Sequence, residues 1–335
     1  MSDYWKNKNV FITGINGFIG GNLAKALLNK GARITGIDRN KDCSSLLFYE
    51  GLADKVNLIQ GELADRKLLK KIITEHEIEA VFHFAAQVEV GVGIKDPFLT
   101  FETNIRGTYC LMEAIRTSGN NIRSIVVAST DKSYGSYPKE SMPYKEDYPL
   151  IPKYPYDTSK ACGDMIAQSY ASDIFYLPVV VTRFCNIYGP GQLNFSAIIP
   201  DGIRSALGYT KFIPRGDGTQ VRDFIYVEDV SELYMLIGEL LNNDPDKLTG
   251  EIFNAGTNVP HSVKDVLEII FSQIGNSIEL EEVISLMKDK KTSGEIETQF
   301  MDFEKANKFT GWKPSHSLEE GLSKTIDWYI EYLRK

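Results

Sequence analysis

The chain has 335 residues, of which 43% are hydrophobic and 24% are charged, and its formal net charge is −8 at pH 7. This composition is sufficient for a large core and for two unequal domains, which excludes a disordered chain. Because the charge is negative and no apolar run reaches the length of a membrane span, we expect no binding to nucleic acid and no insertion into a membrane.

The cysteines and the opening residues indicate the cellular compartment in which the protein works. The four cysteines lie far apart, without a CxxC pair or a metal-like spacing to a histidine, which predicts reduced packing residues and no metal site. The opening residues MSDYWKNKNV contain neither an apolar signal core nor an Arg- and Ser-rich amphipathic pattern. We therefore expect a cytoplasmic protein.

Short apolar runs alternate with helical patterns over the first half of the chain. The runs are rich in Val, Ile and Phe, which is typical of parallel strands joined by crossover helices. This rhythm predicts an α/β fold with a doubly wound parallel sheet. The predicted strands are residues 9–13, 33–38, 56–61, 80–86, 124–130 and 178–184.

The rhythm changes at about Asn186, where loops punctuated by Gly and Pro, short strands and further helices begin. We predict that residues 1–186 form the larger domain. Residues 187–335 should mainly form a smaller, mixed α/β domain that binds the substrate and covers one side of the sheet, including the helical pattern at 227–241. The segment EIFNAG at 251–256 is expected to return to the main sheet as one more strand.

The first predicted strand leads directly into the segment TGINGFIG, which opens the first predicted helix. Gly14 permits a tight turn, Gly17 lets the backbone approach a pyrophosphate, and Gly20 lets helix and strand pack closely. A Gly-rich turn alone would have little specificity, but Asp38 ends the second strand where a carboxylate accepts from a ribose 2′-hydroxyl. The same carboxylate repels a 2′-phosphate, which favours NAD over NADP unless Arg39 swings over that site.

The segment YDTSK places Tyr156 and Lys160 four residues apart, so both project from one face if the segment is helical. Lys160 can then stabilise a tyrosinate, which makes Tyr156 a base at neutral pH when oxidised nicotinamide is near. This spacing also recurs by chance in helices. The presence of Thr130 at the carboxyl end of the fifth predicted strand, where open α/β sheets place their ligands, favours the catalytic interpretation.

With these residues the chain resembles the extended short-chain dehydrogenase/reductase family of nucleotide-sugar epimerases, dehydratases and decarboxylases. The resemblance runs nearly end to end and includes HFAAQ at 83–87, NIRGT at 104–108, RFCNIYGPG at 183–191, RDFIYVEDV at 222–230 and the C-terminal GWKPSHSLEEGL. It implies a Rossmann-type domain, a nucleotide-diphosphate sugar as substrate, and a homodimer formed through the helices near 98–118 and 157–172.

The resemblance also implies roles for individual residues. Asn104 would support the central helix and the active site, Asn186 would lie in a turn that touches the substrate diphosphate, and Arg222 would pair with that diphosphate, as suits a guanidinium. Glu62 either accepts from the adenine amino group or is a solvated loop carboxylate. The predicted cofactor contacts are Gly14, Asn16, Gly17, Phe18, Ile19, Gly20, Asp38, Arg39, Glu62, Leu63, Phe84, Ala85, Ala86, Gln87, Asn104, Tyr156 and Lys160.

The residues after Thr130 discriminate between the reactions of this family. They are Asp131 and Lys132, within STDKSYG. A 4,6-dehydratase needs two proton-handling groups beyond those that oxidise C4, because it must remove the C5 proton and protonate the departing C6 hydroxyl. By resemblance, an Asp-Lys pair here is found in CDP-glucose 4,6-dehydratases and an Asp-Glu pair in dTDP-glucose 4,6-dehydratases. We therefore predict a 4,6-dehydratase with Lys132 as the C5 base and Asp131 as the acid. The resemblance implies CDP-glucose as a candidate substrate.

Other readings of the sequence remain open. A nucleotide-sugar 4-epimerase would use the same oxidation without elimination, and a uronic acid decarboxylase would need a cationic site that the sequence does not reveal. A protein that only senses or binds NAD could keep the fold without the reaction. Tyr134 and the stretch rich in Tyr and Pro that follows it either cover the substrate or brace a long connection.

Overall fold

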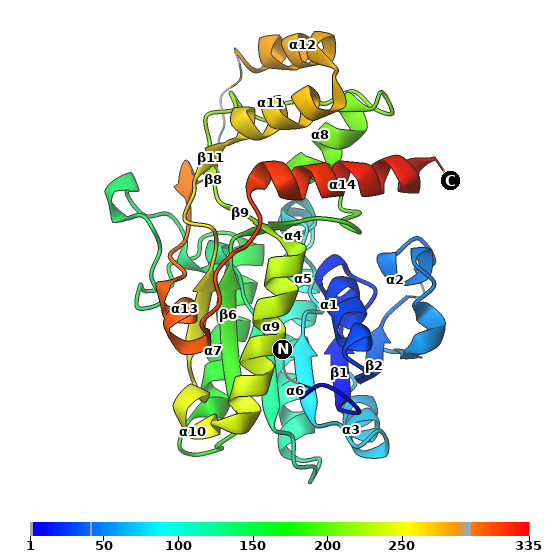
Figure 1. The fold of residues 1–335 in the computed structure, drawn as a ribbon. Helices are drawn as coiled ribbons and strands as arrows, with labels where there is room; N and C mark the ends of the chain where they lie inside the picture. Colours follow the sequence, from blue (N-terminus) through cyan, green and yellow to red (C-terminus); the bar gives the residue numbers. More distant parts are fainter. Residues whose placement is uncertain (1–2, 41, 289, 291–295, 335) are drawn as a thin grey trace.

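The structure is a computed structural model that describes residues 3–40, 42–288, 290 and 296–334. Its centre is a seven-stranded sheet in the order β10-β6-β5-β4-β1-β2-β3, in which every pair of neighbours is parallel (Figure 1). The strands are β1 Asn9–Thr13, β2 Arg33–Asp38, β3 Asn57–Gln60, β4 Ala80–His83, β5 Ser124–Ala128, β6 Val179–Phe184 and β10 Ile252–Ala255.

This sheet confirms the predicted doubly wound α/β fold. The six apolar runs form β1 to β6. Burial of β1, β4 and β6 on both faces explains why these strands are continuous apolar runs instead of alternating, whereas β3 at the sheet edge is more exposed. The segment at 251–256 contains β10, which pairs with β6 at the edge of the sheet.

Helices cover both faces of the sheet. On one face α1 and α9 pack against side chains such as Ile12 and Phe82, and on the other α3, α6 and α7 pack against Phe11 and Val81. The helices are α1 Phe18–Asn29, α2 Leu46–Tyr49, α3 Arg66–Glu75, α4 Val90–Lys95, α5 Pro97–Phe101, α6 Gly107–Arg116, α7 Pro155–Ala171, α8 Ile198–Ala206, α9 Val227–Asn243, α10 Pro245–Leu248, α11 Val263–Ile274, α12 Ser277–Met287, α13 Glu304–Thr310 and α14 Leu318–Leu333.

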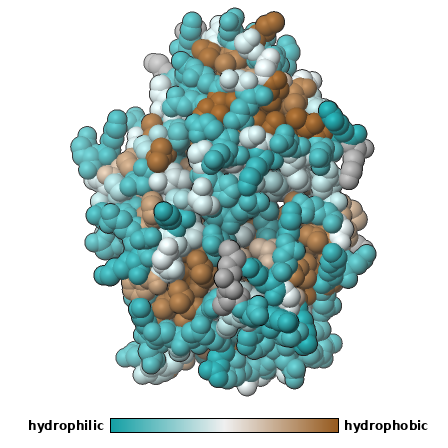
Figure 2. All heavy atoms as spheres, viewed as in Figure 1, coloured by the Kyte–Doolittle hydropathy of each residue, from teal (hydrophilic) through white to brown (hydrophobic). Residues whose placement is uncertain are grey.

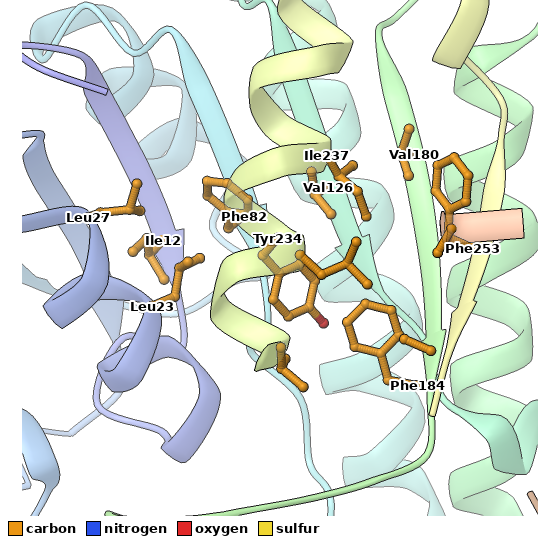
Figure 3. Close-up of a cluster of buried hydrophobic side chains, with 14 of the residues drawn as sticks. Ile12, Leu23, Leu27, Phe82, Val126, Val180, Phe184, Tyr234, Ile237 and Phe253 are labelled. Atoms are coloured by element: carbon orange, nitrogen blue, oxygen red, sulfur yellow. The ribbon is translucent and has the colours of Figure 1, made fainter. Parts of the chain in front are cut away.

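Helix α9 covers one side of the main sheet, as expected for the helical pattern at 227–241. Its buried face, with Tyr234 and Ile237, packs on the sheet beside Val126, Val180 and Phe184 (Figure 3). Periodicity shows that a helix is amphipathic but not which surface its apolar face meets, and here that surface is the sheet.

Helix α10 packs against α9, and α13 packs against α9 and β10 at the side of the main sheet. The elements after Asn186 other than α9, α10, α13 and β10 form a separate layer above the carboxyl ends of the strands (Figure 1). They contain a two-stranded sheet, β7 (Asn186–Tyr188) with β9 (Phe224–Tyr226), and a three-stranded sheet of β11 (His261–Ser262), β8 (Val221–Arg222) and β12 (Thr298–Gln299). Helices α8, α11, α12 and α14 close a second core that includes Ile203, Phe271 and Tyr329.

On the face shown in Figure 2, hydrophilic side chains predominate, and a hydrophobic area lies where Figure 1 places α11 and α14. No helix of the described residues has the length and apolar character to cross a bilayer. All four cysteines are free, but the expectation of packing residues is wrong for Cys43, which is exposed, whereas Cys110 and Cys185 are buried.

Candidate active site

A cleft of about 860 Å³ opens at the carboxyl ends of the central strands, where the strand order reverses between β1 and β4. The predicted site residues that line it are Gly14, Asn16, Gly17, Phe18, Ile19, Gly20, Asp38, Arg39, Glu62, Leu63, Phe84, Ala85, Ala86, Thr130, Asp131, Lys132, Tyr156 and Asn186. Among the described residues, four of the predicted set do not line it, namely Gln87, Asn104, Lys160 and Arg222.

The loop between β1 and α1 packs closely against neighbouring backbone, which its glycines allow. Gly14 has a φ of +70°, and a Cβ atom there would lie 2.8 Å from the Cα atom of Ala85. A Cβ at Gly20 would lie 2.3 Å from the carbonyl oxygen of Gly14. No side chain of the described residues caps the N-terminus of α1, so its first N–H groups remain available to an anion such as a pyrophosphate.

Asp38 lines the cleft at the carboxyl end of β2. Burial raises the pKa of its carboxyl, while hydrogen bonds from backbone groups of Asn40, Arg39 and Asn16 oppose the shift. A carboxylate that is held by the backbone at the end of β2 fits a ribose hydroxyl. Glu62 is exposed at the same end of the cleft.

Tyr156 and Lys160 come from the first two turns of α7 and meet the end of β5. The ammonium of Lys160 donates to the carbonyl oxygen of Ala128 at 2.5 Å. Burial lowers the pKa of Lys160 to about 8, although the carboxylate of Asp164 opposes the shift. Burial also raises the pKa of Tyr156, and a hydrogen bond with the side chain of Thr130 acts in the opposite direction. The phenol therefore needs a nearby cation to lose its proton at neutral pH.

Asp131 and Lys132 begin a 3₁₀ turn, Asp131–Tyr134, directly after Thr130. The hydroxyl of Thr130 donates to Oδ1 of Asp131 at 3.0 Å and accepts from the backbone N–H of Lys132 at 3.4 Å. Burial raises the pKa of Asp131, whereas Lys132, Thr130 and Arg222 lower it. The Thr130 hydroxyl thus contacts both the start of this turn and Tyr156. The groups suited to proton transfer therefore lie together in one corner of the cleft.

Asp157 is a further carboxyl in this corner that the sequence reasoning did not single out. It lies in the first turn of α7 with only 5% of its surface exposed. Burial raises its pKa to about 6, Asp131 adds to the shift, and Lys132 opposes it. Its position beside Tyr156 in YDTSK was the available signal, but a carboxylate at a helix N-terminus is ordinarily read as helix stabilisation.

Asn104 and Gln87 lie behind the cleft wall. Oδ1 of Asn104 accepts from the backbone N–H of Gln87 at 2.7 Å, and Nδ2 of Asn104 donates to Oγ of Ser159 at 2.8 Å. Asn104 belongs to a π-helical turn, Glu102–Arg106, inserted between α5 and α6. It thus connects the loop after β4 with α7, close to Tyr156, because Oγ of Ser159 in turn donates to the Tyr156 carbonyl.

Asn186 and Arg222 lie in the upper layer. The Asn186 side chain lines the cleft and donates to the carbonyl oxygen of Asp223 at 3.2 Å. Arg222 in β8 donates from Nη1 to the carbonyl oxygens of Val221 and Glu297 and sits near enough to Asp131 to lower its pKa.

Sequence reasoning did not identify several other residues of the cleft. They follow Tyr188 or come from α8 and β9, and their side chains are mostly apolar or amide, which carries no recognisable motif. These residues are Gln192, Leu193, Asn194, Ala197, Ile198 and Phe224. Tyr134, by contrast, is fully buried and does not line the cleft, so it does not cover a substrate there.

Known proteins resemble this chain over almost its whole length. A model of the family described as GDP-mannose 4,6 dehydratase matches residues 11–325. The chain is 32% identical over 334 residues to human dTDP-D-glucose 4,6-dehydratase, covering 97% of this chain and 90% of that protein. It is also 31% identical over 335 residues to a trifunctional UDP-glucose 4,6-dehydratase of Arabidopsis thaliana, of which it spans 48% of the length.

Solved structures agree with this relationship. A dTDP-glucose 4,6-dehydratase of Bacillus anthracis in complex with NAD has a TM-score of 0.82 at 30% identity, with 97% of each chain covered. A UDP-glucose 4-epimerase of Thermotoga maritima with UDP-glucose also has a TM-score of 0.82, at 26% identity, with 97% of this chain and 99% of that chain covered. These matches confirm the resemblance inferred from the motifs, and the chain belongs to the GDP-mannose 4,6-dehydratase family.

Proposed function

We propose that the protein is an NAD-dependent nucleotide-sugar 4,6-dehydratase, a hydro-lyase that forms a 4-keto-6-deoxy sugar. The observation that carries the proposal is the turn of Asp131 and Lys132, which lines the same cleft as Thr130 and Tyr156. C4 oxidation alone would not need this second acid and base. The named dehydratases among its relatives support the same reaction.

The cleft fits NAD. Gly14 and Gly20 form the tight turn that brings the β1–α1 backbone to the cleft, because a Cβ at either position would collide with neighbouring backbone atoms. The N-terminus of α1 is uncapped by the described side chains, and Asp38 lies where a ribose hydroxyl would meet it. Bound NAD would supply a hydride acceptor for C4 and the hydride donor for C6, so no external oxidant is consumed.

The side chains of this chain would handle the protons. Tyr156, oriented by Thr130 and assisted by the charge of Lys160, takes the proton of the C4 hydroxyl. The resulting ketone acidifies the C5 proton, which Lys132 removes and then returns to C5 once C6 has received its hydride. Asp131 protonates the C6 oxygen, which leaves as water, and a burial-raised pKa is what an acid in this position requires.

CDP-glucose is the substrate that we propose to test first, on the basis of the Asp-Lys pair. Purified protein would be incubated separately with CDP-glucose, dTDP-glucose, UDP-glucose and GDP-mannose, and each product would be weighed by mass spectrometry. Loss of one water from one donor supports the dehydratase and identifies the nucleotide base of its substrate. An epimerised product of unchanged mass would instead establish the 4-epimerase, the activity named for the Thermotoga maritima neighbour. Loss of carbon dioxide from an added UDP-glucuronate would establish a decarboxylase.

We also propose a homodimer. Large apolar side chains stay exposed on three adjacent helices, with 74% of Phe98 and 62% of Met165 accessible. A second copy of the chain would bury them. Sedimentation velocity should give twice the chain mass, and Phe98→Ser with Met165→Lys should shift it to the monomer mass; a wild-type monomer at micromolar concentration would refute the dimer. The exposed residues of this face are Phe98, Leu99 and Phe101 of α5, Tyr109 of α6 and Met165 of α7.

We infer that the enzyme works in the cytoplasm. All four cysteines are free thiols, which is the expected state in a reducing compartment. Fractionation of the producing cells followed by the dehydration assay tests this location, and activity found only outside the cytoplasmic fraction would contradict it.

A further inference from the structure

The turn that carries Asp131 and Lys132 is held from behind by Tyr134, its last residue. Tyr134 is fully buried, and its hydroxyl donates to Oδ1 of Asn254 in β10 at 2.8 Å. The same hydroxyl accepts from Nη1 of Arg183 in β6 at 3.0 Å, and the guanidinium carbon of Arg183 lies 4.9 Å from the centre of the Tyr134 ring. The turn is therefore fastened to two neighbouring strands of the sheet.

Arg183 also forms an ion pair with the helix that carries Tyr156 and Lys160. Its Nε and Nη2 donate to the two carboxylate oxygens of Asp164 at 2.8 and 3.1 Å. Tyr156, Lys160 and Asp164 follow one another at four-residue intervals in α7 and so lie along one face of that helix. One guanidinium thus contacts both catalytic elements, each through a different side chain.

A second tyrosine holds the same end of the turn. Tyr144 stacks on Tyr134 with ring centres 4.9 Å apart, and its hydroxyl donates to the carbonyl oxygen of Gly135 at 2.6 Å. Asn254 joins this group as well, because its Nδ2 donates to the carbonyl oxygen of Tyr144 at 3.1 Å. The donors and acceptors of this group are thus paired with one another, which leaves the turn little freedom to rotate.

Stability alone does not account for this arrangement. Only 3% of Arg183 and 1% of Asp164 are exposed, and a buried ion pair contributes little net stability because both charges lose their hydration. Neither residue, nor Tyr134, lines the cleft, so none of them would touch the substrate or NAD. Together the three residues link the turn that carries Asp131 and Lys132 to the helix that carries Tyr156 and Lys160.

We propose that Tyr134 and Arg183 are positioning residues that hold the Asp131–Lys132 turn in register with Tyr156 and Lys160. This rests on the proposed dehydratase function. Oxidation at C4 uses α7 and Thr130, whereas elimination across C5 and C6 needs the turn and the helix at a fixed separation on one sugar. A displacement of about 1 Å of a reacting group can slow a step about 100-fold, so elimination is the step that loss of this contact affects most.

Tyr134→Phe is the variant that tests the proposal, because it removes one hydroxyl and keeps the stacked ring. Tyr148→Phe is its matched control. The Tyr148 ring also contacts Tyr144, but its hydroxyl donates to the Ser141 carbonyl at 2.8 Å, away from the turn. In single turnovers with the donor that wild type dehydrates, the absorbance of NADH would be followed as it rises and then decays. Arg183→Lys, which loses the two-pronged contact, is a second variant to be measured if it folds.

Tyr134→Phe should show the wild-type rate of NADH appearance and a decay about 10- to 100-fold slower, with an oxidised sugar still carrying its water detected by mass spectrometry. Tyr148→Phe should behave like wild type. Equal slowing of both phases, or no change in the decay, would overturn the positioning role while leaving the dehydratase intact. Wild-type protein that dehydrates no donor would instead overturn the proposed function, and the inference with it.

Discussion

Individual side chains around the end of β5 are proposed to act in different steps of the reaction, so single substitutions should stop it at different stages. Tyr156→Phe should abolish turnover without loss of NAD, because the phenol, which lines the cleft beside Thr130, is the group proposed to accept the C4 proton. Lys132→Ala should still oxidise C4 but release no water. Rapid-quench mass spectrometry with the wild-type donor distinguishes the two, and unchanged dehydration by Lys132→Ala would remove this residue as the C5 base.

Asp157 should make stability depend on pH. Its folded-state pKa is raised from 3.8 to about 6, so between these values the folded protein binds more protons than the unfolded chain. Folding stability should therefore decrease as pH rises through this window, and the penalty should persist above it. Asp157→Asn lacks this titration and should melt at a higher temperature than wild type at neutral pH, with the gain fading towards pH 4. A melting difference that is independent of pH would contradict the assignment.

The sequence indicates residues that belong to a recognisable motif, but not residues whose role depends on partners far away along the chain. Thr130, Tyr156 and Lys160 were identified from short spacings and a strand end, and the structure brings them together. Tyr134 and Arg183 are 49 positions apart, so no local pattern could reveal their hydrogen bond. The apolar residues that line the upper cleft have no chemical signature either.

Among the elements, the junction of β1 and α1 leaves the least room for change. A Cβ at Gly20 would lie 2.3 Å from the Gly14 carbonyl oxygen, so Gly20→Val must push helix and strand apart. We expect a loss of about 1–3 kcal/mol in stability and weaker NAD binding, since overpacking a tight contact has this effect. Thermal melts and titration with NAD would measure both. Gly91→Ala, whose Cβ would meet nothing within 4 Å, is the control and should leave both values near wild type.

Element boundaries were predictable where burial shapes composition. The runs of β1, β2 and β6 are apolar because both faces of a parallel sheet are covered, and the structure ends them within a residue or two of the prediction. The π-helical turn Glu102–Arg106 was not foreseen, since a single extra residue in a helix does not alter hydropathy periodicity enough to detect. It matters because it carries Asn104.

Across the whole molecule, the sheet and the upper layer are built from interleaved parts of the chain. A fragment of residues 1–186 would lack β10, which pairs with β6, and α9, which covers Val126 and Val180. We predict that this fragment shows no cooperative melting transition by circular dichroism, whereas co-expression with residues 187–335 restores one. A fragment that folds and melts cooperatively alone would show that the sheet is complete without its edge strand.

The late position of β10 in the chain also has a consequence for synthesis on the ribosome. After Asn186 has been made, the ribosome must add the residues up to Ile252 before the edge of β6 can be paired, which takes roughly 3–13 s at ordinary elongation rates. During this interval the nascent chain presents an unpaired strand edge and the apolar surface that α9 later covers, both of which favour aggregation. Protein yield in cells should therefore depend on chaperones that bind nascent chains more strongly than the stability of the finished enzyme would indicate.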